Sequence, residues 1–264
     1  MSGVYVILRT NGNLGELGID NVLPDGVSRS LHPGIGKNVA MSGKCSLHLA
    51  ELLSSRVCHD FASALGTVTN SVQIARDGAK MDTEALDLAA EAAMGMVHRL
   101  RLLRAAWGGD TDTMTVADLR KFSTGVSRGR LRVDLDGIDP GASFAADAAR
   151  LVLNVMMLGA ECLPHGGVIA FQGDGQRELM VSITGPSAAW TQGFPICLTG
   201  PEAAWAHLAQ EAESQIGGLQ CALTALIAHD SGLGISVLMA GKAEAAPPLL
   251  LRLSRQDRSP ISMA

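Results

Sequence analysis

His59 is the residue of this sequence whose surroundings best suit covalent chemistry. A neutral imidazole is a nucleophile, and the ordinary histidine pKa of about 6.5 leaves the ring mostly neutral near pH 7. Asp60 follows it directly, and a carboxylate beside an imidazole can fix the tautomer of the ring and raise its basicity. The alternative is that His59 is an ordinary surface histidine, since most exposed side chains carry no function.

The residues around His59 predict one long amphipathic helix over residues 46–77. Its apolar side chains recur at spacings of three and four, which is one stripe of a helix: Leu49, Leu53, Val57, Phe61, Ala64, Val68, Val72 and Ala75. At about 100° per residue, His59 lies nearly opposite this stripe and should be exposed. Its own face carries small or polar residues, which predict a smooth strip that another protein can lie against: Ser55, Ala62, Ser63, Gly66 and Asn70.

A second helix is predicted after a short turn, with Asp82 as its N-cap. It carries a heptad pattern of apolar residues, namely Leu86, Ala93, Leu100 and Trp107 at one position and Ala89, Met96 and Leu103 at the other. Two such helices form an antiparallel hairpin that cannot cover both stripes alone. A second copy of the chain would close a four-helix bundle with twofold symmetry. The alternative is that the hairpin packs only on the rest of its own chain.

Arginines flank the predicted histidine strip. His59 lies about twenty residues before the turn and Arg99 about twenty after it, so the antiparallel pair brings them to the same level. Arg99 and Arg101 are therefore candidates to hold a phosphoryl group or an acidic partner, and Arg56 joins the expected contact surface. The alternative is a solvated basic patch.

Residues 56–63, with the sequence RVCHDFAS, and the following Leu65-Gly66 carry a family resemblance. They resemble the H-box of ChpT-type dimeric histidine phosphotransferases, which are kinase-derived relay proteins of bacterial phosphorelays. That family usually has proline after the serine, where this chain has Ala64. The resemblance implies that His59 is the phosphorylated residue, with Asp60 beside it, and that the chain is a homodimer. It also implies two kinds of partner, the receiver domain of a hybrid histidine kinase and the receiver domains of response regulators, with Mg²⁺ bound by the receivers.

The rest of the chain predicts helices layered on one face of a mixed sheet. We expect helices over 115–126, 143–163 (capped by Ser143), from Pro201 onward and over 219–229, and strands over 130–136, 167–172, 178–184, 234–240 and 249–253. This order is similar to the ATP-binding domain of histidine kinases. The expected fold is therefore α+β, an antiparallel helical hairpin over 43–108 followed by a degenerate kinase-like α/β sandwich over 111–257. Residues 1–42 and 258–264 are expected to be disordered, and Met41-Ser42-Gly43 is a candidate natural start.

The kinase-like domain lacks the sequence features of an ATP site. The resemblance places Asn154 where an active kinase holds magnesium, although a buried hydrogen-bonding role is the alternative. Residues 184–187, with the sequence TGPS, stand where kinases have an Asp-x-Gly-x-Gly loop, and residues 217–219, GGL, are what remains of a glycine-rich lid. Phosphate binding needs a run of free backbone N–H groups. The sequence therefore predicts weak or no ATP binding and no stably bound cofactor.

Composition limits the remaining classes. The net charge of −5 argues against nucleic-acid or anionic-membrane binding, and 47% hydrophobic against 18% charged residues indicates a well-buried core. Five cysteines without a CxxC motif fit a reduced, cytoplasmic protein. Four other histidines lie in separate segments and predict no metal site: His48, His165, His207 and His229.

These observations favour a phosphotransferase that passes a phosphoryl group through His59 between receiver aspartates. One alternative is an ATP-dependent sensor kinase that autophosphorylates His59. Another is a non-catalytic scaffold that binds a response regulator through the same helix without transfer.

Overall fold

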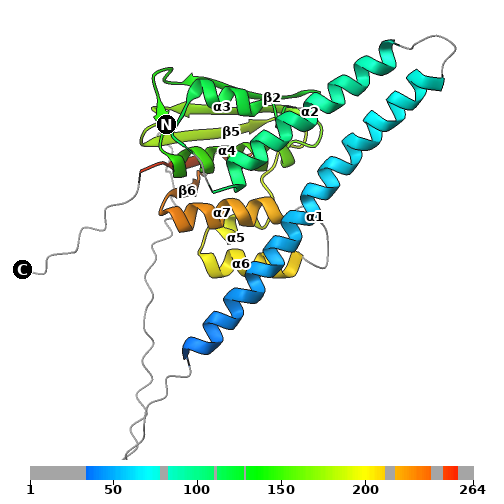
Figure 1. Ribbon diagram of the computed structural model, residues 1–264. Helices are drawn as coiled ribbons and strands as arrows, with labels where there is room; N and C mark the ends of the chain where they lie inside the picture. The colour runs from blue at the N-terminus through cyan, green and yellow to red at the C-terminus, as the bar shows by residue number, and fades with distance from the viewer. Residues whose placement is uncertain are drawn as a thin grey trace, which may run out of the picture.

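Two long helices form an antiparallel hairpin whose base packs on a sheet domain (Figure 1). The computed structural model describes residues 34–77, 83–109, 112–127, 129–211, 218–238 and 246–254, with side chains from residue 46 onward. The hairpin consists of α1 (Gly34–Asp77) and α2 (Thr83–Trp107). Its distal end, where α1 finishes and α2 begins, projects clear of the sheet domain, while the earlier part of α1 passes beside α6 and α7 (Figure 1).

The N-terminal limit of the hairpin differs from the prediction. Disorder was expected through residue 42, but α1 begins at Gly34, so that prediction was wrong for residues 34–42. The physical reason is that extending a formed helix by one residue costs far less than starting one, so glycine and asparagine need not stop it. Residues 1–33, the turn with the expected Asp82 cap, and the tail 258–264 lie outside the described residues.

The sheet domain contains one five-stranded mixed sheet, as the sequence predicted. Its strand order is β2-β4-β5-β7-β6, with β2 parallel to β4 and every other pair antiparallel. Helix α4 packs on β4. The Ile169 side chain lies so close to Gly159 that a Cβ added to this glycine would be 3.0 Å from Ile169 Cδ1. The elements are β1 (Met114–Thr115), α3 (Val116–Ser123), β2 (Leu131–Ile138), β3 (Ser143–Phe144), α4 (Ala146–Glu161), β4 (Gly167–Gly173), β5 (Glu178–Thr184), α5 (Phe194–Cys197), α6 (Pro201–Glu211), α7 (Leu219–Ser231), β6 (Gly234–Val237) and β7 (Leu249–Arg252).

Local side chains explain several element boundaries. Helix α3 begins with a capping box, in which the Thr115 hydroxyl accepts from the Asp118 N–H and the Asp118 carboxylate accepts from the Thr115 N–H. The Thr115 hydroxyl also lies 2.7 Å from Asp118 Oδ2, and hydrogen bonds from this hydroxyl, from Lys121 Nζ and from the Thr115 N–H lower the pKa of Asp118 to about 2. The β4–β5 turn contains Gly175 at φ 69°, and the C-cap of α7 is Gly232 with φ 68°. Both angles are left-handed and favour glycine.

Three short elements depart from the prediction. The strands β1 and β3 pair with each other, Thr115 opposite Ser143, so Ser143 is a strand residue and not the cap of α4. The N-cap of α4 is Ala145, which makes no side-chain capping bond. Helix α5 was not predicted. Elements of two to four residues are too short for apolar periodicity to reveal them.

One hydrophobic core joins the hairpin to the sheet domain. Leu102, Leu103 and Ala106 near the end of α2 are buried in the same core as α4, α7 and the sheet. Leu49, Leu53, Val57 and Phe61 of α1 are partly buried and pack against it. The base of the hairpin is thus fixed on the domain. None of the helices in the described part of the chain is both long and apolar enough to span a bilayer.

Candidate functional site

His59 projects from α1 into solvent, as the helical pattern predicted. Its side chain is 70% exposed. The residues expected to form the histidine strip are all exposed too: Ser55, Ala62, Ser63, Gly66 and Asn70. A Cβ added at Gly66 would meet no atom within 4 Å, so the strip is low and open there.

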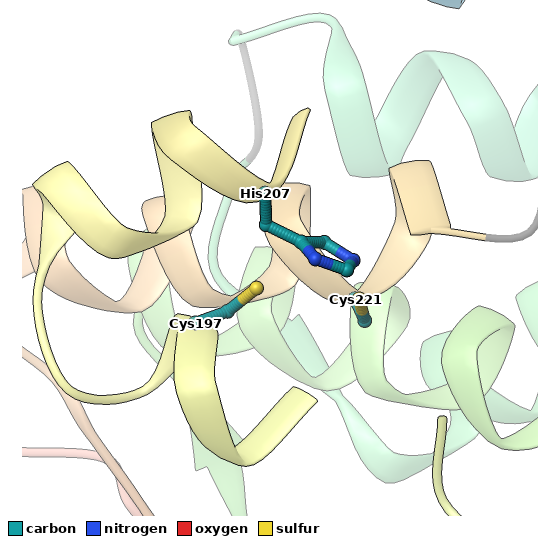
Figure 2. Close-up of side chains that lie close together, drawn as sticks. All are labelled: Cys197, His207 and Cys221. Carbon is teal, nitrogen blue, oxygen red and sulfur yellow. The ribbon is translucent and has the colours of Figure 1, made fainter. Parts of the chain in front are cut away.

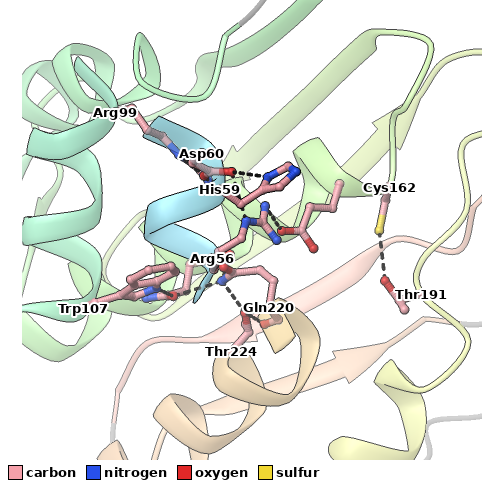
Figure 3. A network of polar contacts seen from close by, with 11 residues as sticks. Arg56, His59, Asp60, Arg99, Trp107, Cys162, Thr191, Gln220 and Thr224 are labelled. Carbon is pink, nitrogen blue, oxygen red and sulfur yellow. Dashed lines mark hydrogen bonds and ion pairs between the residues drawn. The ribbon is translucent and has the colours of Figure 1, made fainter. Parts of the chain in front are cut away.

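Asp60 accepts hydrogen bonds from two arginines and lies farther from His59. Its Oδ1 accepts a hydrogen bond from Arg56 Nε at 3.3 Å, and its Oδ2 accepts from Arg99 Nε at 3.1 Å and Arg99 Nη2 at 2.9 Å (Figure 3). The distance from His59 Nδ1 to Asp60 Oδ1 is 3.9 Å, which exceeds hydrogen-bonding range. The expectation that Asp60 fixes the His59 tautomer through a direct hydrogen bond was therefore wrong. At this distance the carboxylate acts on the ring through its charge.

A largely buried glutamate, Glu161, whose side chain is 20% exposed, extends this arrangement into the sheet domain. Arg56 Nη2 lies 2.7 Å from Oε1 of Glu161, at the end of α4. Glu161, Arg56, Asp60 and Arg99 thus form an ion-pair chain that joins α4, α1 and α2. The other oxygen, Oε2, is buried without a hydrogen-bond partner, and burial raises the pKa of Glu161 above its ordinary value of 4.5, opposed by the charge of Arg56.

The ion-pair chain changes the expected roles of two arginines. Arg56 and Arg99 were predicted to face a partner, but their side chains are only 15% and 11% exposed. They point inward because Asp60 and Glu161 offer charge neutralisation there, which a largely buried guanidinium requires. Arg101 is exposed on α2. The Arg56–Asp60 pair has the i, i+4 spacing of helical ion pairs, a signal that was present in the sequence, whereas nothing local points to Glu161.

Asn154 occupies the centre of a second polar cluster. Its Oδ1 accepts hydrogen bonds from Trp107 Nε1 and Gln220 Nε2, both at 3.1 Å. Its Nδ2 donates to the carbonyls of Ala106 at 3.0 Å and Arg150 at 2.9 Å. The side chain is fully buried. These contacts tie the end of α2 to α4 and α7 and match the structural alternative for Asn154, a buried hydrogen-bonding residue.

One of the histidines lies close to two cysteines that are distant from it in the sequence. The sequence separates the histidines into different segments, but the fold brings His207 close to Cys197 and Cys221. Helices α5, α6 and α7 each supply one of these side chains, so no short sequence motif predicts that they come together.

Comparison with known proteins supports a class for the chain. Residues 116–243 match the family described as the histidine phosphotransferase C-terminal domain. The protein phosphotransferase ChpT of Brucella abortus (strain 2308) is 25% identical over 197 residues, which cover 73% of this chain and 90% of that protein. These two similarities support a ChpT-type phosphotransferase. A solved structure of a bacterial phosphotransferase shares the fold, with a TM-score of 0.58, 21% identity, and coverage of 78% of this chain and 95% of that one.

The buried end of the ion-pair chain should make folding depend on pH. Because burial favours the protonated carboxyl, the folded chain holds the Glu161 proton more tightly than the unfolded chain does. Unfolding then releases this proton, so a rise in pH favours the unfolded state. We expect the free energy of unfolding of the wild type, relative to Glu161→Gln, to be highest below pH 4.5 and to fall as pH rises through the raised folded pKa.

Urea unfolding from about pH 4 to about pH 8, followed by circular dichroism, measures this difference. Glu91→Gln replaces an exposed glutamate of α2 and is the control for the loss of one negative charge. A difference between wild type and Glu161→Gln that increases with pH would contradict the assignment.

Proposed function

We propose that this phosphotransferase relays phosphoryl groups through His59 between aspartates of receiver domains in a bacterial two-component phosphorelay. The observation that carries the proposal is a single imidazole, 70% exposed, on a strip of small side chains. The ring nitrogen Nδ1 lies 3.9 Å from Asp60 Oδ1. We therefore assign the other ring nitrogen, Nε2, as the nucleophile. The relative's name, protein phosphotransferase ChpT, supports the class of reaction.

The proposed transfer exchanges one bond to phosphorus for another. Nε2 of neutral His59 attacks the phosphorus of a receiver phosphoaspartate. The N–P bond forms while the P–O bond to the aspartate breaks, and the aspartate leaves as a carboxylate. The proton on Nδ1 stays, and the nearby charge of Asp60 stabilises the cationic ring. A second receiver reverses these steps. The receivers would supply Mg²⁺ and most of the transition-state stabilisation, and the chain itself would need no stably bound cofactor.

The partner would lie on the histidine strip. Ser55, Ala62, Ser63, Gly66 and Asn70 offer exposed surface with little bulk, so a helix or loop of the receiver can approach His59 closely. Arg101 is exposed and can contact an acidic rim of the receiver. The roles of Arg56 and Arg99 would be to position Asp60.

ATP would not be the phosphoryl donor. Asn154, which the family resemblance places at the magnesium position of a kinase, already makes four hydrogen bonds to Trp107, Gln220, Ala106 and Arg150. Binding a hydrated cation there would require breaking this buried cluster, and each buried group left unpaired costs about 1–3 kcal/mol. This observation favours a relay over the alternative of an autophosphorylating kinase.

We further propose a homodimer formed through one apolar face of the hairpin. The dimer face consists of large apolar side chains that are 37–55% exposed: Leu65, Val72, Leu86, Met94, Val97 and Leu100. Asp60 of α1 and Arg99 of α2 face each other across the hairpin. At about 100° per residue, the dimer-face residues of α1 lie about 120° around the helix from Asp60. Those of α2 lie about 150° around the helix from Arg99, with both angles measured in the direction of increasing residue number. Because the helices are antiparallel, both groups point to the same side of the hairpin.

The dimer face and His59 lie on different sides of α1. His59 is about 100° from Asp60 in the opposite rotational sense. A second copy packed on the dimer face would therefore close a four-helix bundle and leave His59 accessible. We also place the protein in the cytoplasm, which suits the free thiols of Cys58, Cys162, Cys197 and Cys221.

The first prediction from this proposal concerns transfer itself. A purified phosphorylated receiver should pass its label to the wild type and leave His59→Gln unlabelled, because the amide is not a nucleophile. Parallel incubation with labelled ATP should label neither protein. Gel autoradiography measures both reactions, and Gln73→Ala, on the same helix, is the control for folding. Labelling by ATP would favour a kinase, and receiver binding without transfer would favour a scaffold.

The second prediction concerns the histidine strip. Gly66→Trp should slow transfer from a phosphorylated receiver at least about tenfold, which corresponds to about 1.4 kcal/mol, because the indole blocks the strip. Gly66→Ala should transfer normally and stabilise α1 by about 1 kcal/mol. Both variants should still be labelled by phosphoramidate, a donor small enough to reach His59. Normal transfer by Gly66→Trp would remove the strip from the docking surface.

The third prediction concerns the dimer face. Light scattering should give twice the mass of one chain for the wild type, and Leu100→Lys should weaken self-association at least about tenfold, because a lysine there would be buried without a partner. Leu47→Lys changes a leucine that is 63% exposed, compared with 55% for Leu100. It lies about 18 Å along α1 from His59, and this variant should remain dimeric. A monomeric wild type would contradict the proposal.

A further inference from the structure

Two cysteines and a histidine converge between α5, α6 and α7, away from His59. Cys197 lies at the end of α5, His207 in α6 and Cys221 in the first turns of α7 (Figure 2). Their possible ligand atoms all lie within 4.8 Å of one another. Both cysteines are fully buried and His207 is partly buried. Elsewhere in the described residues, no other three His, Cys, Asp or Glu side chains come together in this way.

The donor set and spacing suit a borderline-soft divalent cation. Zn²⁺ binds cysteine sulfur at about 2.3 Å and histidine nitrogen at about 2.0 Å in a tetrahedron, so its donors lie about 3.5–3.9 Å apart. Reaching this spacing from 4.8 Å or less needs only small side-chain movements. Gly193 packs directly on the His207 ring, where any side chain would collide with it. The glycine therefore leaves the imidazole the room it needs beside the two sulfurs.

Charge balance favours the same cation. Two thiolates neutralise Zn²⁺, so the site can be buried without an uncompensated charge. As the two S–Zn bonds form, each thiol gives up its proton to solvent, and His207 binds as a neutral ring through one nitrogen. Cys221 Sγ now donates a hydrogen bond to the Gly218 carbonyl at 3.1 Å, and this bond would be exchanged for the metal bond.

We propose that Cys197, His207 and Cys221 form a Zn²⁺ site that links α5, α6 and α7, with a water molecule as the fourth ligand. The link would hold α6 beside α7 and against α1, which α6 contacts. The site is independent of the His59 chemistry.

Cobalt tests this site directly. Titrating Co²⁺ into the reduced full-length protein should give the visible d–d bands of a tetrahedral complex and a sulfur-to-cobalt charge-transfer band, at one Co²⁺ per chain. Zn²⁺ should displace the cobalt and raise the thermal midpoint of unfolding. Affinity should fall as pH is lowered, because protons compete for both thiolates. The absence of these bands in the wild type, or binding only at adventitious millimolar levels, would overturn the proposal whether or not any variant folds.

Substitutions then assign the ligands. Cys197→Ser, Cys221→Ser and His207→Gln should each weaken Co²⁺ binding at least about tenfold. Cys162→Ser is the matched control, since Cys162 is also buried but lies beside Thr191, 3.7 Å away, outside the group. Its cobalt spectrum should equal that of the wild type. His59→Gln should also bind cobalt normally, which separates failure of this proposal from failure of the relay. Unchanged binding by Cys197→Ser or Cys221→Ser would overturn the site.

Discussion

The ion-pair chain of Glu161, Arg56, Asp60 and Arg99 is the constraint on which the presentation of His59 depends. Its two carboxylates and two guanidinium groups balance in charge, so the chain can sit largely buried between three helices. Rotation of α1 about its axis would break these contacts. Because His59 lies between Arg56 and Asp60 on α1, its outward direction is set by the partners of these two residues on α2 and α4.

The sequence predicted those parts of the fold that have a local period. The apolar spacing of α1 placed His59 in solvent, and the strands expected over 130–136, 167–172 and 178–184 correspond to β2, β4 and β5. The sequence did not predict elements that are too short to show a period, or contacts between residues that are far apart along the chain. The two-residue strands β1 and β3 have no period, and the Gly34 start of α1 reflects helix extension and not residue preference. Glu161 and the Cys197–His207–Cys221 group depend on tertiary packing, which spacing along the chain does not reveal.

Burial explains why two expectations about polar side chains turned out differently. Arg99 was expected to contact a partner, but a guanidinium near a buried carboxylate gains more from a close ion pair than from solvent. Asn154 follows the same rule. Its amide satisfies groups on α2, α4 and α7 at once, so a position that could have held a cation became a structural junction between the hairpin and the sheet domain.

The narrowness of the histidine strip has a kinetic consequence for the proposed relay. One small surface around one ring nitrogen has room for a single visiting domain at each His59. Donor and acceptor would then have to occupy it in turn, with the modified enzyme as the only species that connects them. Such a scheme is a double displacement, and the two visiting domains would compete for the same surface, so their relative abundance would govern how quickly the phosphoryl group moves on.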